Sequence, residues 1–140
     1  MHISSVAPKY DNVIPLFTSI AAGFPSPAES YVERNLNLHD HLVRRSASTF
    51  FVRVSGHSMI NVGIYNGDLL IVDRSVEPRN RSIVVAVVNG EFTLKRLIKK
   101  NGKVFLRPEN PDCYEIEITN EMQFEIWGVA LHNVHDLGNV

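Results

Sequence analysis

The chain has 140 residues, of which 44% are hydrophobic and 21% are charged. These proportions are those of an ordinary globular protein, so the sequence predicts one small domain with a terminal arm and excludes both a multidomain assembly and wholesale disorder. Fourteen Lys and Arg residues against fifteen Asp and Glu residues give a net charge of -1. A protein that binds duplex DNA directly usually carries a positive excess, so we expect no direct sequence-specific DNA binding.

The cysteine content and the apolar runs indicate where the protein works. The single cysteine, Cys113, can form neither an internal disulfide nor a multi-thiolate metal site, which favours a reducing compartment, the cytoplasm. The longest apolar run, residues 83–88, is far shorter than the roughly 20 residues of a membrane-spanning helix, so we expect no membrane attachment. The histidines lack metal-ligand spacing and the glycines form no phosphate-binding loop, so we expect no metal and no cofactor.

The N-terminal part of the chain shows no sustained periodicity. Residues 1–25 are interrupted by proline and glycine, which predicts an extended arm outside the core. Residues 26–29 read Ser-Pro-Ala-Glu, with a serine at the N-cap, a proline at the first helical position and a glutamate placed to bond back to the cap. We therefore expect a short helix over 27–34, followed by a second short helical turn over 38–43.

From residue 49 onward the sequence changes to a strand pattern. It is rich in Val, Ile, Phe and Thr, and Asn-Gly pairs at 66–67, 89–90 and 101–102 lie between apolar runs, which is a strong hairpin signal. The predicted strands lie near residues 49–54, 68–73, 82–89, 91–98, 103–107, 113–118 and 123–132. Seven short strands joined by tight turns predict a mainly β fold, a small, partly open barrel or sandwich.

Charge is sorted along the last third of the chain. The basic block comprises Lys95, Arg96, Lys99, Lys100, Lys103 and Arg107, and the acidic block that follows comprises Glu109, Asp112, Glu115, Glu117, Glu121 and Glu125. Blocks of this kind are usually the solvated faces of adjacent strands that attract each other across a sheet. A docking strip for a partner protein is the alternative.

A candidate nucleophile follows the first predicted strand of this region. Ser58 lies in the turn Ser55-Gly56-His57-Ser58-Met59, and a serine on such a turn can expose its hydroxyl beside free backbone N–H groups that stabilise an oxyanion. The neighbouring His57 would point to the opposite side of an extended backbone. A general base must therefore come from elsewhere, and an ordinary polar turn is the alternative.

Lys95 is the candidate base, on the strand predicted at 91–98. A Ser/Lys dyad requires a neutral lysine, and lowering its pKa from about 10.4 to about 7 takes roughly 4 to 5 kcal/mol of disfavoured charge. Apolar neighbours and the charge of Arg96 favour such a shift. Alternation, however, places Lys95 on the strand face of Glu91 and Thr93, so the local sequence leaves its burial open, and a basic surface residue is the alternative.

Three separated motifs, at residues 54–59, 67–73 and 90–97, resemble those of the LexA/UmuD family of self-cleaving Ser/Lys peptidases, in particular its UmuD type. The likeness extends upstream to residues 15–17 and 23–28 and so covers nearly the whole chain. The resemblance implies the LexA-like peptidase fold, a mainly β domain with an extended N-terminal arm and a short helix. It also implies an enzyme, an autoproteolytic serine endopeptidase.

The resemblance also assigns roles to particular residues. It implies that Ser58 is the nucleophile, that Lys95 is the general base, and that the backbone N–H groups of His57 and Ser58 form the oxyanion hole. The family cuts itself between a small residue and a glycine, which is matched here by Ala22 and Gly23. UmuD proper has an acid in place of His57 and a cysteine in place of Ala22, and a backbone donor and a small pocket tolerate both changes.

Domain organisation and partners follow from the same resemblance. Residues 1–22 would be the arm removed by self-cleavage, 23–45 a linker with the short helix, and 46–140 the peptidase and dimerisation domain. A RecA-DNA filament formed after DNA damage would stimulate cleavage in the SOS response. The trimmed homodimer would then serve as the accessory subunit of an UmuC-like Y-family DNA polymerase in error-prone translesion synthesis.

Two alternatives stay open. In the first, the domain is a non-catalytic dimeric adaptor module, which would never shorten itself in alkali. In the second, it is a relative of a phage or plasmid repressor core. Full repressors of the family carry an N-terminal DNA-reading domain, and the roughly 22 residues before the expected cut are too few for one, which disfavours this second alternative.

Overall fold

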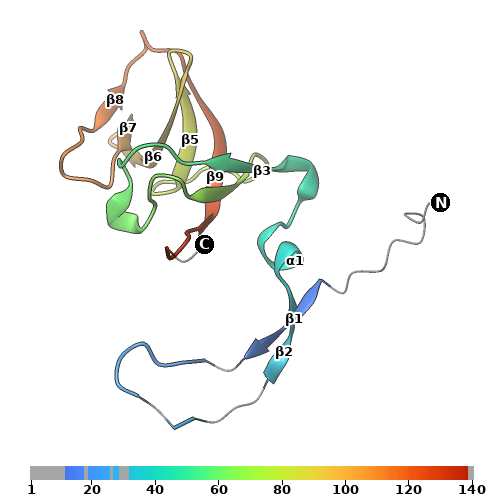
Figure 1. The fold of residues 1–140 in the computed structure, drawn as a ribbon. Coiled ribbons are helices and arrows are strands. Elements are labelled where there is room, and N and C mark those ends of the chain that lie inside the picture. The colour runs from blue at the N-terminus through green and yellow to red at the C-terminus, as the bar shows by residue number, and fades with distance from the viewer. Residues whose placement is uncertain (1–11, 18, 26, 29–31, 139–140) are drawn as a thin grey trace. The chain divides into compact units, whose positions relative to one another are not determined.

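A computed structural model describes residues 12–17, 19–25, 27–28 and 32–138 of the chain. The chain divides into two compact units, an N-terminal unit, Met1–Arg44, and a C-terminal unit, Arg45–Val140. Figure 1 shows the strands and helices of each unit. Of the helices in the described residues, none has the length and apolar character needed to cross a membrane.

The N-terminal unit contains a two-stranded antiparallel hairpin. Strand β1, Val13–Phe17, pairs with β2, Val32–Asn37, and α1, Leu38–Leu42, follows directly. The side-chain oxygen of Asn37 caps α1 by accepting a hydrogen bond from the backbone N–H of Asp40 at 3.1 Å. The helical turn predicted over 38–43 is therefore confirmed.

The helix predicted over 27–34 is wrong where the structure describes it. Residues 27 and 28 are not helical and residues 32–34 belong to β2, whereas residues 26 and 29–31 lie outside the described residues. The Ser-Pro-Ala-Glu start is a local signal, and an isolated helix of two turns is marginal in water. Pairing with β1 satisfies the backbone of β2 instead, so tertiary structure overrides the cap.

The C-terminal unit is built on one seven-stranded antiparallel sheet with the order β3-β4-β9-β5-β6-β7-β8. Its strands are β3, Thr49–Arg53; β4, Leu69–Asp73; β5, Ile83–Val88; β6, Glu91–Lys100; β7, Lys103–Arg107; β8, Ile116–Ile118; and β9, Phe124–Val134. All seven predicted strands are confirmed. In the described part of the sheet β3 and β8 are edge strands, which leaves the predicted barrel partly open. Figure 1 shows β3 crossing the direction of β5 and β6, so the sheet is strongly curved.

The sheet is buried on both faces at its centre. On β5, Val84 and Ala86 belong to one apolar cluster and Val85 belongs to the other, because successive side chains of a strand point to opposite faces. Two of the three Asn-Gly hairpin signals have positive φ at both residues, with values of 50° and 83° for Asn89 and Gly90. This backbone matches the twist of the flanking strands and fixes the register of β5 and β6.

Three residues of the basic block form ion pairs with three residues of the acidic block. Arg107 on β7 forms an ion pair with Glu115 at 2.7 Å, and Lys103 lies 4.0 Å from Glu117 on β8. Arg96 on β6 pairs with Glu109 in the loop after β7. The expected attraction between adjacent strands is thus confirmed for Lys103 and Glu117, whereas Glu115 and Glu109 lie in the segment between β7 and β8.

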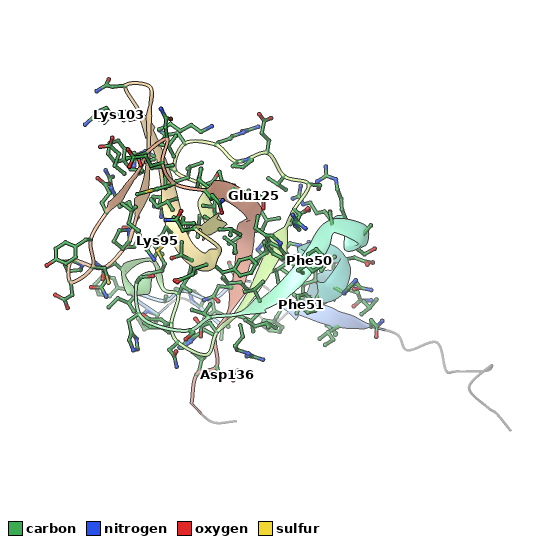
Figure 2. The ribbon with its side chains drawn as sticks, turned by 90° about the horizontal axis from the view of Figure 1, so that it is seen from above. Phe50, Phe51, Lys95, Lys103, Glu125 and Asp136 are labelled. Atoms are coloured by element: carbon green, nitrogen blue, oxygen red, sulfur yellow. The ribbon has the colours of Figure 1, made fainter. Side chains whose placement is uncertain are left out.

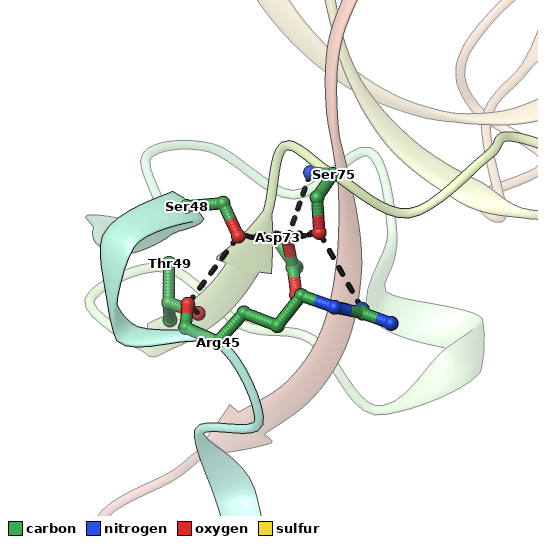
Figure 3. A network of polar contacts seen from close by, with 5 residues as sticks. All are labelled: Arg45, Ser48, Thr49, Asp73 and Ser75. Atoms are coloured by element: carbon green, nitrogen blue, oxygen red, sulfur yellow. Dashed lines mark hydrogen bonds and ion pairs between the residues drawn. The ribbon is translucent and has the colours of Figure 1, made fainter.

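A buried carboxylate anchors the beginning of β3 (Figure 3). Asp73, at the end of β4, is 1% exposed and accepts hydrogen bonds from the Ser48 hydroxyl at 2.8 Å and from the Ser75 hydroxyl at 2.7 Å. Arg45 lies 3.8 Å from the same carboxylate, and its carbonyl accepts a hydrogen bond from Thr49 Oγ1 at 2.6 Å. The network fixes the chain where it enters the strand that leads to Ser58.

Candidate active site

The turn after β3 presents Ser58 to the interior. Gly56 adopts a φ of 94°, a left-handed conformation that glycine reaches without strain, and its N–H donates to Asn66 Oδ1 at 2.9 Å. Met59, which is 1% exposed, inserts into the apolar cluster beneath the turn. The bend and this anchor leave Ser58 half-buried, while the side chain of His57 is exposed.

The structure brings Lys95 against Ser58, although the two residues are 37 positions apart in the sequence. Lys95 Nζ donates to Ser58 Oγ at 3.3 Å, to Thr93 Oγ1 at 2.7 Å and to the Leu94 carbonyl at 3.2 Å. Ser58 Oγ also donates to the Leu94 carbonyl, at 3.4 Å. Figure 2 shows Lys95 surrounded by other side chains, whereas Lys103 lies at the periphery. A serine and a lysine therefore share one half-buried site.

Burial makes the Lys95 side chain bind its proton less tightly than a surface lysine does. Desolvation of the ammonium lowers the pKa of Lys95, and this effect outweighs the opposing charge interaction with Cys113, which raises it. The local sequence does not decide whether Lys95 is buried. In the structure, residues of neighbouring strands line the pocket around Lys95 and bury it partly. The direction of the shift is the one that a lysine base requires.

The two side chains line one pocket of about 280 Å³. Its apolar lining includes Val52, Val54, Leu70, Val85 and Leu94, and its polar lining includes Ser58, Thr93 and Lys95. The apolar walls come from β3, β4, β5 and β6, so a side chain or backbone segment that enters the pocket displaces water from around the lysine. The pocket thus combines a hydroxyl, an amine and room for a short extended segment.

Backbone donors lie beside the hydroxyl. Within the described residues, neither the N–H of His57 nor the N–H of Ser58 donates to a protein acceptor. The carbonyl groups of the same two residues are both occupied, by Asn110 Nδ2 at 2.8 Å and by the Glu109 N–H at 2.7 Å. The turn therefore keeps its acceptors bound and its donors available for a developing oxyanion.

Sequence reasoning assigned no role to Thr93, Glu109 or Asn110. Thr93 was recognised as a neighbour of Lys95 on the same strand face, and that spacing was the signal for its hydroxyl contact. Glu109 was assigned only to the acidic block. Asn110 lies in a loop whose contact with His57 spans 53 positions, and no local pattern predicts such a contact.

The residues of the expected cleavage site belong to the N-terminal unit. Ala22 and Gly23 lie in the stretch between β1 and β2, and both are exposed. A Cβ placed on Gly23 would have no heavy atom within 4 Å, so the packing of its own unit does not require a glycine there. Across the described residues, no cluster of three or more His, Cys, Asp and Glu side chains is arranged to hold a metal ion.

Comparison with known proteins finds relatives over most of the chain. A family described as Peptidase S24-like matches residues 15–131. Protein MucA of Salmonella typhimurium is 48% identical over 117 residues, covering 82% of this chain and 79% of MucA. Protein SamA of Salmonella typhimurium strain LT2 is 44% identical over 134 residues, covering 93% of each chain. The LexA repressor of Bordetella pertussis is 41% identical over 119 residues, covering 85% of this chain and 55% of the repressor.

The family match extends over most of the sequence, from within β1 to within β9. Peptidase S24 proteins are in general serine peptidases that cleave themselves, and the UmuD-type relatives act in the SOS response to DNA damage. The chain therefore belongs to the Peptidase S24 family and is an UmuD-like member of the LexA/UmuD group.

Proposed function

We propose that the protein is an autoproteolytic serine endopeptidase that cuts its own Ala22–Gly23 bond, with Ser58 as nucleophile and Lys95 as general base. The observation that carries the proposal is the 3.3 Å contact between Lys95 Nζ and Ser58 Oγ in a pocket that lowers the pKa of the lysine. A nucleophile within hydrogen-bond reach of a base with a lowered pKa is the minimal requirement for acyl transfer.

Catalysis begins with the loss of one proton from the Lys95 ammonium. Of its three hydrogen bonds, the one to Ser58 is the longest, so removal of this proton breaks the weakest contact and turns the nitrogen lone pair toward Oγ. Thr93 and Leu94 continue to accept the two protons that stay on the neutral amine. They hold Nζ in place for the next step.

The neutral amine then accepts the Ser58 hydroxyl proton as Oγ forms a bond to the Ala22 carbonyl carbon. The carbonyl π electrons move to oxygen, and the N–H groups of His57 and Ser58 bind the resulting oxyanion. When the intermediate collapses, the bond between Ala22 and Gly23 breaks and the Gly23 nitrogen takes the proton from Lys95. Water hydrolyses the Ser58 ester by the same route, releasing residues 1–22 and 23–140.

The substrate is supplied by the chain itself. Tethering provides a high effective concentration, so a modest catalyst suffices, and productive docking of the arm sets the rate. A small residue followed by glycine lets an extended backbone approach the dyad closely. In this scheme residues 1–22 are the arm that is removed, 23–45 the linker and 46–140 the peptidase and dimerisation domain.

The biological setting of the proposal is supported by the UmuD-like relatives. A RecA-DNA filament would stimulate the cut in the cytoplasm, and the trimmed homodimer would join an UmuC-like Y-family DNA polymerase for translesion synthesis. The net charge of -1 agrees with a protein that meets DNA through partners.

Incubation of the purified protein between pH 7 and pH 11 tests the chemistry. We expect a new N-terminus at Gly23 by mass spectrometry, with a rate that rises with pH as more Lys95 becomes neutral. Ser58→Ala and Lys95→Ala should stay intact. The matched controls are Ser46→Ala, which lies outside the pocket, and Lys99→Ala on the same strand, both at exposed positions, and both should cleave as the parent does.

Processing of the Ser58→Ala or Lys95→Ala protein at the normal rate would exclude the dyad. A parent protein that never shortens in alkali would instead support a non-catalytic dimeric adaptor. Cleavage at another bond would leave the Ser58/Lys95 dyad supported and would exclude Ala22–Gly23 as the cleavage site.

A further inference from the structure

The turn that carries the nucleophile is held from outside by the loop between β7 and β8. Asn110 Nδ2 donates to the His57 carbonyl at 2.8 Å, and the Glu109 N–H donates to the Ser58 carbonyl at 2.7 Å. A third bond runs the other way, from the Asn61 N–H to the Glu109 carbonyl at 2.8 Å. Two consecutive peptide groups of the turn are therefore bound to one loop.

The bond from Asn110 has a consequence for the oxyanion hole. The peptide that joins His57 to Ser58 is trans, so its C=O and its N–H point in opposite directions. Fixing the His57 carbonyl on Asn110 therefore fixes the direction of the Ser58 N–H. We propose that Asn110 is a positioning residue of the peptidase, which aims the Ser58 N–H at the oxyanion through the peptide it holds.

The amide of Asn110 is itself held in one orientation. Its Oδ1 accepts from the Asp112 N–H at 2.9 Å, and its backbone carbonyl accepts from the Cys113 N–H at 3.1 Å. The Asp112 N–H can only donate, so it faces Oδ1, and the His57 carbonyl can only accept, so it faces Nδ2. These two partners fix the orientation of the side-chain amide. The donor is thus directed at the turn before any substrate binds.

The same loop is fastened to the strand that carries the base. Arg96, next to Lys95 on β6, forms an ion pair with the Glu109 carboxylate and donates to the Arg81 carbonyl at 2.6 Å. Glu109 therefore connects the strand of the base to the turn of the nucleophile through its side chain and its backbone. Asn110 extends this connection to the oxyanion donor.

The inference rests on the proposed function, and its test uses the alkaline self-cleavage of the full chain. Asn110→Asp removes the donor and keeps the Oδ1 acceptor for Asp112, but it adds a negative charge. Asp112→Asn removes one charge from an exposed side chain of the same loop and should leave the rate unchanged. The double variant, Asn110→Asp with Asp112→Asn, preserves the net charge of the loop and replaces the donor at the His57 carbonyl by a carboxylate oxygen.

We expect the double variant to cleave about tenfold more slowly than Asp112→Asn at every pH. Outright loss of an oxyanion donor costs about a hundredfold to a thousandfold, and here the Glu109 N–H still holds the turn. The pH at which the rate reaches half its maximum should not move, because the net charge of the loop is unchanged and neither substituted residue contacts Lys95. If only the stabilisation of the oxyanion is weakened, the maximal cleavage rate falls and the pH midpoint stays the same. If the position of Lys95 also changes, the pH midpoint moves as well.

A double variant that cleaves at the rate of Asp112→Asn, or whose loss of rate comes with a displaced pH profile, would overturn the role of Asn110. Thermal melting establishes which variants are folded, and Asn110→Ala replaces the double variant if that one is not. If the parent protein fails to cleave, or Ser58→Ala cleaves, the proposed function fails. If the parent cleaves and only the Asn110 effect is absent, the dyad stands and this inference alone is wrong.

Discussion

The shortest hydrogen bond of the Lys95 ammonium goes to Thr93, not to Ser58. A hydroxyl on the same strand face accepts one ammonium proton and restricts where Nζ can move. Desolvation lowers the pKa of Lys95. A partner that binds the charged form opposes deprotonation in general, so we expect the bond to Thr93 to act in the opposite direction. The side chain of Thr93 therefore lowers the fraction of neutral amine at a given pH and in return holds Nζ in a fixed position.

Thr93→Val separates these two effects because valine keeps the branched shape and lacks the acceptor. We expect the pH midpoint of self-cleavage to fall, since the ammonium loses a hydrogen bond, and the maximal rate to drop about tenfold, since Nζ is no longer held. The measurement is the cleavage rate between pH 7 and pH 11. Thr119→Val, at an exposed site, is the control, and a midpoint that rises would contradict the assignment.

At the scale of elements, β9 lies between β4 and β5 in the sheet. It pairs with both β4 and β5, and each pairing contains a register shift. Gly128 lies where β9 crosses close to β4, and a Cβ there would be 2.6 Å from Val72 Cγ1 and 3.5 Å from the Asp73 carbonyl. Such a distance forces either the core or the strand to move.

Gly128→Ala should therefore destabilise the C-terminal unit by about 1 to 3 kcal/mol, the usual cost of overpacking a core. The measurement is urea unfolding of the full chain in the Ser58→Ala background, which prevents cleavage during the assay. Glu125→Ala, at an exposed position of the same strand, should change the stability by less than about 0.5 kcal/mol. If the two substitutions change the free energy of unfolding equally, the close approach at Gly128 does not limit the size of the side chain there.

The same scale shows what the sequence can and cannot predict. The strands of the C-terminal unit follow from period-two patterns and Asn-Gly turns, which are local signals, and all seven were located. The β1–β2 hairpin was not predicted, because each of its strands is supported by pairing with the other across the stretch that separates them. At the site, family motifs indicated Ser58 and Lys95, whereas the contact between Asn110 and His57 depends on a loop closure that no pattern encodes.

At the scale of the whole molecule, two buried carboxylates lie at the two ends of β4. Asp68 accepts from the Tyr65 N–H and from Asn133 Nδ2, both at 2.8 Å, and its other oxygen lies 2.6 Å from His135 Nδ1. Burial by itself would raise the pKa of Asp68, but these hydrogen bonds and His135 outweigh it and the pKa is lowered. Burial likewise opposes ionisation of Asp73, and its bonds from Ser75 and Ser48, with Arg45, bring its pKa below the ordinary value.

A lowered carboxyl pKa makes folding depend on pH in one direction. Each carboxylate stabilises the fold fully above its unfolded pKa, about 3.9, and this contribution is lost as the pH falls through the lower folded value. The Ser58→Ala protein should thus lose stability in urea below about pH 4. Asp73→Asn should cost about 1 to 3 kcal/mol at pH 7 and weaken the acid dependence, and an unaltered acid transition in this variant would contradict the assignment.

Lys95 and Arg96 are consecutive on β6, and side chains alternate between the two faces of a strand. One residue thus directs the amine into the pocket while the next fastens the loop that holds the nucleophile's turn. A single inserted or deleted residue in β6 upstream of this pair would exchange their faces and abolish both attachments at once. The length of that strand segment is therefore under tighter constraint than the identity of its exposed side chains.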